Sequence, residues 1–219
     1  MKPNPNEQGA LIPTLIIGSL FFIFGFVTWL NASLIPYLKI ACELSDFQSL
    51  LVAFAFYIAY FFTALPMSAI LRRLGLKNGM MAGLVIMALG AALFIPAALS
   101  RTYWIFLAGL FVTGTGLTLL QTAANPYVTI IGPLESAAKR ISIMGICNKL
   151  AGVIAPLIMG AIILKDADGI LAQTLHMEGA EKALLLDSLA KRVILPYSLM
   201  VLSLLVLAAG IRFSSLPEI

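Results

Sequence analysis

The sequence contains little charge, little cysteine and almost no histidine. Charged residues make up 11% of its 219 positions, and it has two cysteines and one histidine. Soluble domains carry about 25% charged residues. Cys42 and Cys147, even together with His176, cannot supply the close set of ligands that a zinc site needs. The composition therefore argues against a soluble domain, and we expect no metal.

Enzyme signatures are missing as well. The sequence has no GxSxG or HExxH motif, and none of its long apolar stretches contains Asp or Glu. Those motifs position a nucleophile or a metal-bound base. The formal charge of +4 and the pI near 9.2 come without a basic stripe interleaved with aromatic residues. We therefore expect no enzyme, no bound cofactor and no nucleic-acid partner.

Long apolar runs are what the sequence does contain. Hydrophobic residues make up 61% of the chain, and its mean hydropathy is +1.01. A helix needs about 20 apolar residues to cross the hydrocarbon core of a bilayer. The segments that are long enough are residues 11–37, 49–71, 79–99, 103–130, 141–164 and 193–213. The sequence thus predicts an all-α membrane protein with six transmembrane helices in a lipid bilayer.

The positions of lysine and arginine predict the orientation, because cytoplasmic links between membrane helices are enriched in both. With residues 1–10 inside, the inner segments hold Lys2, Arg72, Arg73, Lys77, Lys139, Arg140 and Arg212. The short outer links then hold only Lys39 and Arg101. Both termini are therefore predicted to be cytoplasmic. Cys42 and Cys147 should lie towards opposite faces, too far apart for a disulfide.

One long outer link, about residues 165–192, interrupts this pattern of short connections. It carries charges of both signs, so it weakens the orientation argument only slightly. Its stretch EGAEKALLLDSLAKR has apolar residues at helical spacing. This spacing predicts a helix that lies on the membrane surface or against the spans.

Two decapeptides reveal an internal repeat: TWLNASLIPY at 28–37 and TLLQTAANPY at 118–127. A shift of ninety positions matches Thr28 with Thr118, Asn31 with Gln121, Pro36-Tyr37 with Pro126-Tyr127 and Pro66 with Pro156. The two copies are separated by three spans, so the second copy runs upside down. This is the pattern of a 3+3 inverted repeat, which in transporters encloses the substrate site near the membrane midplane.

Amide side chains recur within the apolar spans. Gln121 and Asn125 are four residues apart and share one helix face, which we expect to continue as a wet stripe through Thr115, Thr118 and Thr122. An unpaired amide in a bilayer costs several kcal/mol, so each needs a partner. Asn31, Gln121, Asn125 and Asn148 are therefore predicted either to line a polar cavity or to bond neighbouring helices together. The repeat favours the cavity for Asn31 and Gln121.

Trp29 and Lys149 are two further candidates. Trp29 suits stacking on a sugar ring as well as anchoring at the outer interface. Lys149 is the one residue with a clear charge inside a predicted span, and charged residues there are usually functional. Its position near the start of the fifth span would also let it extend to the inner interface. Tyr57 and Tyr60 are predicted to be packing residues.

Three segments resemble the fucose/glucose/galactose permease family of the major facilitator superfamily. They are FFIFGFVTWLNASLIPYL, GLTLLQTAANPYVTIIGP and ISIMGICNKLAGVIAPLIMG. The resemblance runs through nearly the whole chain, roughly residues 15–164 and the closing SSLPEI. The TAANP segment and the loop that holds Gly132, Pro133, Glu135 and Ser136 are specific to this family. RRLGLK resembles a degraded form of the superfamily's loop between spans two and three, with Arg72 at its usual acidic position.

The resemblance implies a secondary active sugar transporter that works by alternating access. Asn31, Gln121, Asn125 and Asn148 would then hydrogen-bond a hexose or N-acetylhexosamine, with Trp29 stacking and Lys149 in a coupling or charge role. The fucose–proton branch has carboxylates where this sequence has Ala32 and Gln121. That departure favours the glucose, galactose or N-acetylglucosamine branch, and leaves proton and sodium open as the co-transported ion.

The resemblance also implies that this chain is half of a major facilitator fold. Residues 11–213 would form the N-terminal six-helix half, and residues 214–219 would begin the central linker. The family has twelve spans, so a second six-helix half or a homodimer partner is expected. A fragment, a homodimer subunit and a split transporter all fit, with a fragment favoured. The expected location is a bacterial-type inner membrane.

Overall fold

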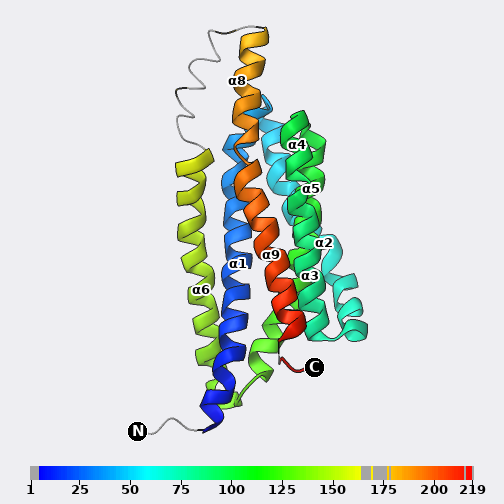
Figure 1. Ribbon diagram of the computed structural model, residues 1–219. Coiled ribbons are helices and arrows are strands. Elements are labelled where there is room, and N and C mark those ends of the chain that lie inside the picture. Colours follow the sequence, from blue (N-terminus) through cyan, green and yellow to red (C-terminus); the bar gives the residue numbers. More distant parts are fainter. Residues whose placement is uncertain (1–4, 164–168, 170–176, 178, 215, 219) are drawn as a thin grey trace.

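The computed structural model describes residues 5–163, 169, 177, 179–214 and 216–218. Nearly all of these residues are helical, and this described part contains no strand (Figure 1). The elements are α1 Pro5–Ala41, α2 Asp46–Leu74, α3 Leu76–Ala92, α4 Phe94–Ser100, α5 Tyr103–Ile130, the 3-10 helix η1 Leu134–Ser136, α6 Ala137–Ile158, the π-helix η2 Met159–Ile163, α8 Ala180–Lys191 and α9 Ile194–Phe213.

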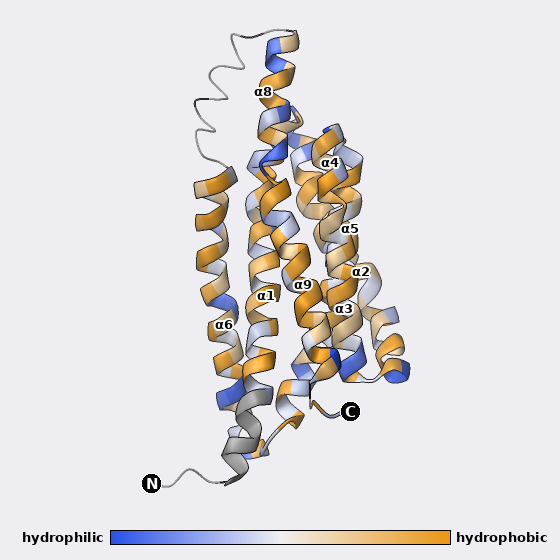
Figure 2. Cartoon of the chain, viewed as in Figure 1, coloured by the Kyte–Doolittle hydropathy of each residue, from blue (hydrophilic) through white to orange (hydrophobic). Residues whose placement is uncertain are grey.

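The prediction of six membrane-spanning helices is confirmed. They cover Pro13–Ala41, Asp46–Leu74, Leu76–Ser100, Tyr103–Ile130, Leu134–Ile162 and Ala180–Phe213. The third span is interrupted at Leu93, which separates α3 from α4. The polar residues gather at the ends of the helices, and hydrophobic residues fill the middle (Figure 2). A bundle of this kind satisfies its backbone polar groups inside each helix, as a bilayer requires.

The helix predicted in the long outer link exists as α8, which α9 continues after a short break. It packs against α1 and α4 rather than apart from the spans. Leu186, Leu189 and Ala190 are buried, and the hydroxyl of Tyr37 donates hydrogen bonds to the carbonyl oxygens of Leu189 and Ala190 at 2.8 Å. Most of residues 164–178 lies outside the described residues.

The two halves of the repeat pack in the same way at their first crossing. Helix α1 packs along α6, and its counterpart α5 packs along α2. A glycine allows each approach: a Cβ on Gly25 would lie 2.6 Å from the backbone oxygen of Asn148, and one on Gly114 would lie 2.6 Å from that of Phe56. The inverted repeat seen in the sequence is therefore present in the helix packing.

A second crossing joins α3 to α5 through glycines on both helices. Gly83 and Gly90 of α3 face Gly116 and Gly109 of α5, and any added Cβ would lie less than 3 Å from backbone atoms of the other helix. Small residues let membrane helices approach closely, where van der Waals contact and not the hydrophobic effect holds them together. Helix α3 also packs along α9.

The ends of the helices next to α8 are held by an ion-pair cluster around Arg101. Its guanidinium lies 3.1 Å from Asp187 and 3.7 Å from Glu43, and its Nε donates to the carbonyl of Ala41. Glu43 also pairs with Lys182 at 2.7 Å. The cluster joins the α1–α2 link, the α4–α5 link and α8. Both cysteines are free, as predicted.

The opposite ends of the helices are held by Arg140 and by the closing segment. The buried guanidinium of Arg140 donates to the carbonyl oxygens of Val128, Thr129, Gly132 and Pro133 and to the Ser136 hydroxyl. It thereby caps the C-terminal end of α5, where a cation is favoured. Glu218 accepts hydrogen bonds from the backbone N–H groups of Lys77 and Asn78 at the start of α3.

Candidate functional site

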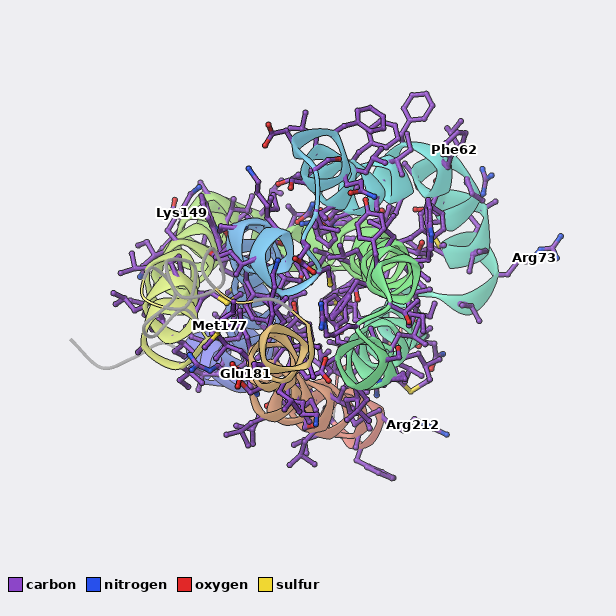
Figure 3. All side chains as sticks on the ribbon, turned by 90° about the horizontal axis from the view of Figure 1, so that it is seen from above. Phe62, Arg73, Lys149, Met177, Glu181 and Arg212 are labelled. Carbon is purple, nitrogen blue, oxygen red and sulfur yellow. The ribbon has the colours of Figure 1, made fainter. Side chains whose placement is uncertain are left out.

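One side of the bundle is left open. Only 17% of the most apolar stretch of the fifth span, which contains α6, is buried inside the protein, and only 22% of that of α2, against 61% for α5. Seen from above, Lys149 of α6 and Phe62 of α2 lie towards one side, while Arg212 of α9 lies towards the other (Figure 3). We call the surface formed by the exposed residues of α1, α2, α5 and α6 on that first side the open face.

Helices α1 and α6 bring three of the predicted site residues together. The Asn148 side chain lies against Gly25, and its Nδ2 donates to the carbonyl of Phe21 at 3.3 Å. One helical turn further along α6, the Trp29 indole lies over Gly152. The Lys149 Nζ lies 5.8 Å from the Trp29 ring centroid. A larger residue than glycine at 152 would displace the indole, so Gly152 sets the position of Trp29.

Asn148, Trp29 and Lys149 offer a ligand three different kinds of contact. Because Nδ2 of Asn148 is engaged by α1, its Oδ1 is the atom left to accept a hydrogen bond. Trp29 is 40% exposed and presents an apolar ring. The exposed Lys149 adds a cation over that ring, a contact worth about 0.5–1 kcal/mol at exposed sites. An acceptor, an aromatic plate and a cation are suited to a ligand that carries many hydroxyl groups.

Helix α5 contributes the other two amides. Gln121 is half-buried and Asn125 is exposed, and both lie on the helix face that contains Gly114, which packs on α2. The water-facing stripe of polar side chains predicted along this helix contains fewer available groups than expected. The hydroxyls of Thr115, Thr118 and Thr122 donate to the carbonyls of residues one turn earlier, and Thr118 is buried. The helix itself satisfies these hydroxyls.

The repeat-matched prolines add backbone acceptors to the same regions. A proline inside a helix has no N–H, so the carbonyl four residues before it loses its partner. Pro36 affects Ala32, and Pro126 affects Thr122, which neighbours Gln121. Pro156 similarly affects Gly152, over which Trp29 lies. These carbonyls can accept hydrogen bonds without any polar side chain.

Asn31 does not lie on the open face. It is 2% exposed, and its Oδ1 accepts a hydrogen bond from the Tyr197 hydroxyl at 2.9 Å. The Tyr197 ring in turn stacks on Phe94, with centroids 4.0 Å apart. The expectation that Asn31 faces a polar cavity therefore differs from the structure, because the side of α1 that bears Asn31 is turned towards α9. Asn31 joins two helices.

Sequence reasoning missed two residues of the open face. Tyr57 was expected to pack inside, but it is 56% exposed on α2, where its ring lies against Phe56 and Tyr60. The dense aromatic run around it was the available signal. Gly152 gave no signal, because its role depends on a side chain that lies more than a hundred residues away in the sequence. Tyr60 is half-buried, in keeping with packing.

Comparison with protein families gives a match to the Major Facilitator Superfamily over residues 17–167. The glucose/galactose transporter of Brucella abortus is 47% identical over 148 residues, which cover 68% of this chain and 36% of that protein. The L-fucose-proton symporter of Escherichia coli is 35% identical over 219 residues, which cover 100% of this chain and 50% of that protein. The chain thus spans about half the length, or less, of the curated relatives it matches.

Solved structures agree with this result. The crystal structure of the Escherichia coli fucose:proton symporter FucP matches 96% of this chain and 50% of its own, with a TM-score of 0.81 and 33% identity. FucP in the outward conformation matches with a TM-score of 0.82 and 32% identity. The predicted fold, a six-helix half of this architecture, is therefore confirmed. This chain is a multi-pass membrane protein that belongs to the major facilitator superfamily.

Proposed function

We propose that this chain forms the N-terminal six-helix half of a secondary active transporter for a hexose or N-acetylhexosamine. Its relatives are named as transporters of glucose, galactose and fucose. The observation that carries the proposal is the open face, where Trp29 and Lys149 are exposed beside Asn148 and where α5 presents Asn125. A second six-helix half would cover this face and complete the sugar site between the halves, which then alternate access to it.

The proposed contacts follow from the geometry. Gln121 and Asn125 have both donor and acceptor atoms to offer, Asn148 offers its Oδ1, and Trp29 offers an apolar plate. Amides can each donate to and accept from sugar hydroxyls, whereas a carboxylate only accepts. We leave Asn31 out of this set, because it is bonded to Tyr197 inside the half.

Coupling in this proposal does not use a carboxylate at positions 32 or 121, which hold Ala32 and Gln121. Lys149 supplies the charge on the open face and would respond to the ion or to the conformational state. Either a proton or sodium would serve as the co-transported ion. Uptake measured with an imposed pH gradient and, separately, with an imposed sodium gradient distinguishes the two.

The test is hexose uptake by the chain in its native gene context, with Gln121→Ala and Asn125→Ala compared with Asn78→Ala. Asn78 is an amide at the inner end of α3, where its side chain bonds to Leu74. Lost hydrogen bonds to a sugar should lower uptake by about tenfold or more at equal membrane abundance. Normal uptake by both open-face variants would show that the site assignment is wrong.

A second candidate is a membrane subunit that does not transport by itself and needs a second six-helix half. It is favoured by the extent of the open face and by the chain's span of half its relatives' length. It predicts no uptake by the chain alone and no self-association. In a chain without its natural cysteines, Ala32→Cys places a thiol on the open face. Formation of an Ala32→Cys disulfide dimer would instead show that two copies cover this face together.

A further inference from the structure

The two repeats differ at one crossing. Helices α3 and α5 are closed on each other by Gly83, Gly90, Gly109 and Gly116. The equivalent pair, α1 and α9, is barely in contact. In the ninety-residue shift of the repeat, Gly109 and Gly116 of α5 correspond to Ser19 and Phe26 of α1. Helix α9 has no glycine before Gly210. Because α1 carries side chains at these positions, this pair lacks the glycines that close the α3–α5 crossing.

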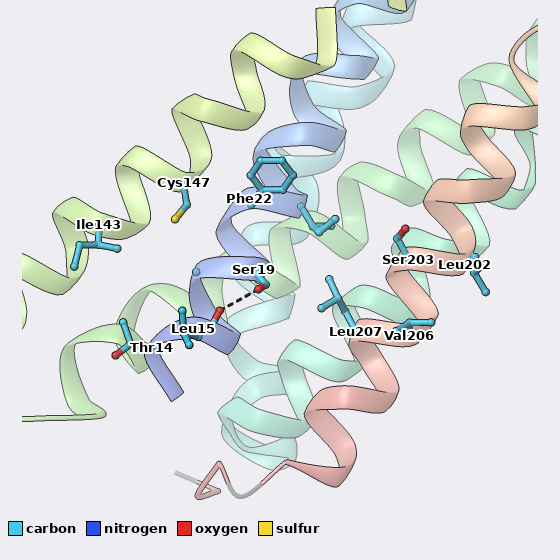
Figure 4. A pocket seen from close by; sticks show the side chains of 12 residues that line it. Thr14, Leu15, Ser19, Phe22, Ile143, Cys147, Leu202, Ser203, Val206 and Leu207 are labelled. Carbon is cyan, nitrogen blue, oxygen red and sulfur yellow. Dashed lines mark hydrogen bonds between the residues drawn. The ribbon is translucent and has the colours of Figure 1, made fainter. Parts of the chain in front are cut away.

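A groove lies between α1, α6 and α9 (Figure 4). One part has a volume of about 640 Å³ and is lined by Ser19, Phe22, Cys147, Ser203 and other residues of the three helices. A second part of about 280 Å³ continues it, shares Phe22 and Ser203, and includes Phe26. The groove is therefore lined by Ser19 and Phe26, the two residues that stand where the repeat has glycines.

The groove lies on a different flank of α6 from the open face. Consecutive residues of a helix point about 100° apart. Asn148 faces α1, Cys147 on one side of it lines the groove, and Lys149 on the other side lies by the Trp29 ring. The groove is thus separate from the proposed sugar site, and this inference does not depend on that function.

The dimensions of the groove match one leaflet of a bilayer. Along α1 it runs from Thr14 to Val27, about 20 Å at 1.5 Å per residue. This takes it from near the start of the span Pro13–Ala41 to its middle. One leaflet contributes about 15 Å of a 30 Å hydrocarbon core. An apolar cavity does not hold water, because water needs several polar partners.

The end of the groove nearest the N-terminus has a cation beside it. Lys139 precedes the groove residue Ile143 by four positions on α6, so it lies on the same face, one turn closer to the membrane surface. It is exposed and forms no ion pair with any residue whose side chain the structure describes. A lysine at this depth attracts the phosphate of a lipid headgroup.

We propose that the groove is a binding site for one membrane phospholipid from the leaflet at the N-terminal end of the span. One acyl chain lies between α1 and α9, and the phosphate lies near Lys139. The lipid takes the place that direct helix contact fills between α3 and α5. It therefore stabilises the half at the crossing where the repeat lacks glycines.

The first test is native mass spectrometry of the chain purified in mild detergent. One retained phospholipid per chain is expected. Ser203→Phe should fill the groove and lower lipid occupancy at least tenfold, whereas Ala209→Phe, an exposed position of α9 outside the groove, should leave it unchanged. Absence of retained lipid in the unaltered chain, or equal occupancy in the two variants, would overturn the proposal.

The second test needs no change to the groove, because Cys147 lines it. In the delipidated Cys42→Ser chain, phosphatidylglycerol in mixed micelles should slow alkylation of Cys147 by N-ethylmaleimide at least fivefold. Lys139→Gln should raise the phosphatidylglycerol concentration for half-protection about threefold, and an unchanged concentration would refute the headgroup contact. The site is refuted if lipid gives no protection, if glucose, galactose or fucose protects instead, or if Cys147 is unreactive without lipid.

Discussion

Asn31 and Gln121 occupy matching positions in the two repeats but have opposite surroundings. Asn31 is buried and bonded to Tyr197 on the packed side of the bundle, formed by α3, α9 and the helix faces turned towards them. Gln121 is half-buried and borders the open face. The same type of side chain, at the same place in an inverted repeat, therefore bonds helices together in one copy and remains available to a ligand in the other.

The difference comes from the neighbours and not from the amides. On the packed side, α9 brings a tyrosine hydroxyl within 2.9 Å of Asn31, so the cost of burying the amide is partly offset. On the open face, α2 approaches α5 closely at Gly114, above Gln121 and Asn125 in the helix, and leaves these amides room. In this chain, the repeat-matched amide that packing leaves partly exposed is the one available to a ligand.

The largest expected effect contrasts two glycines, one on each side. A Cβ on Gly116 would lie 2.6 Å from the Met87 nitrogen and 2.7 Å from the Gly83 oxygen, whereas a Cβ on Gly145 would meet nothing within 4 Å. Gly116→Ala should therefore destabilise the chain by more than about 2 kcal/mol, because it forces two backbones apart. Gly145→Ala should leave stability unchanged. Thermal unfolding in detergent measures both, and equal melting temperatures would disprove the contrast.

The next effect tests the buried amide. Tyr197→Phe removes the donor to Asn31 and should cost about 1–3 kcal/mol, because a buried polar atom is left unpaired. Tyr57→Phe on the open face, where the ring is 56% exposed, serves as the control and should cost nothing measurable. Adding Asn31→Leu to Tyr197→Phe should recover part of the loss. A double variant less stable than Tyr197→Phe would contradict this account.

The smallest effect concerns the lysine over the indole. In a Trp104→Phe background, Lys149→Gln should increase quenching of Trp29 fluorescence by acrylamide while changing stability by less than about 1 kcal/mol. Lys191→Gln, an exposed lysine of α8, is the matched control. Unchanged quenching would show that Lys149 does not hold the ring, and a large stability loss would show that it is structural.

The burial of Cys42 leads to a prediction about the pH dependence of its alkylation. It is half-buried beside the Arg101 cluster, and burial raises the pKa of its thiol to about 11. Since the thiolate is the reactive form, little of it is present at neutral pH. Alkylation of Cys42 should therefore rise about tenfold per pH unit up to pH 11 and stop there. A rate that levels off near pH 9 would show that the thiol is freely solvated.

Part of the candidate site could be predicted from the sequence, and particular residues show where prediction ended. Trp29, Asn148 and Lys149 were identified as polar or aromatic breaks in apolar spans, and the structure brings them together. Asn31 was identified in the same way but lies elsewhere, because sequence spacing does not tell which side of a helix meets a neighbour. Gly152 was not identified, because its role is the space it leaves for Trp29.

The sequence by itself determined the six spans and the inverted repeat. Both depend on local properties, namely the length of apolar runs and the recurrence of short motifs, and a bilayer leaves helices as the form such runs can take. Only the tertiary structure decided which amides remain open, that Arg140 caps α5 and that a groove separates the first half of α1 from α9. Those outcomes depend on contacts between residues far apart in the chain, and a single glycine or its absence changes the distance between two helices.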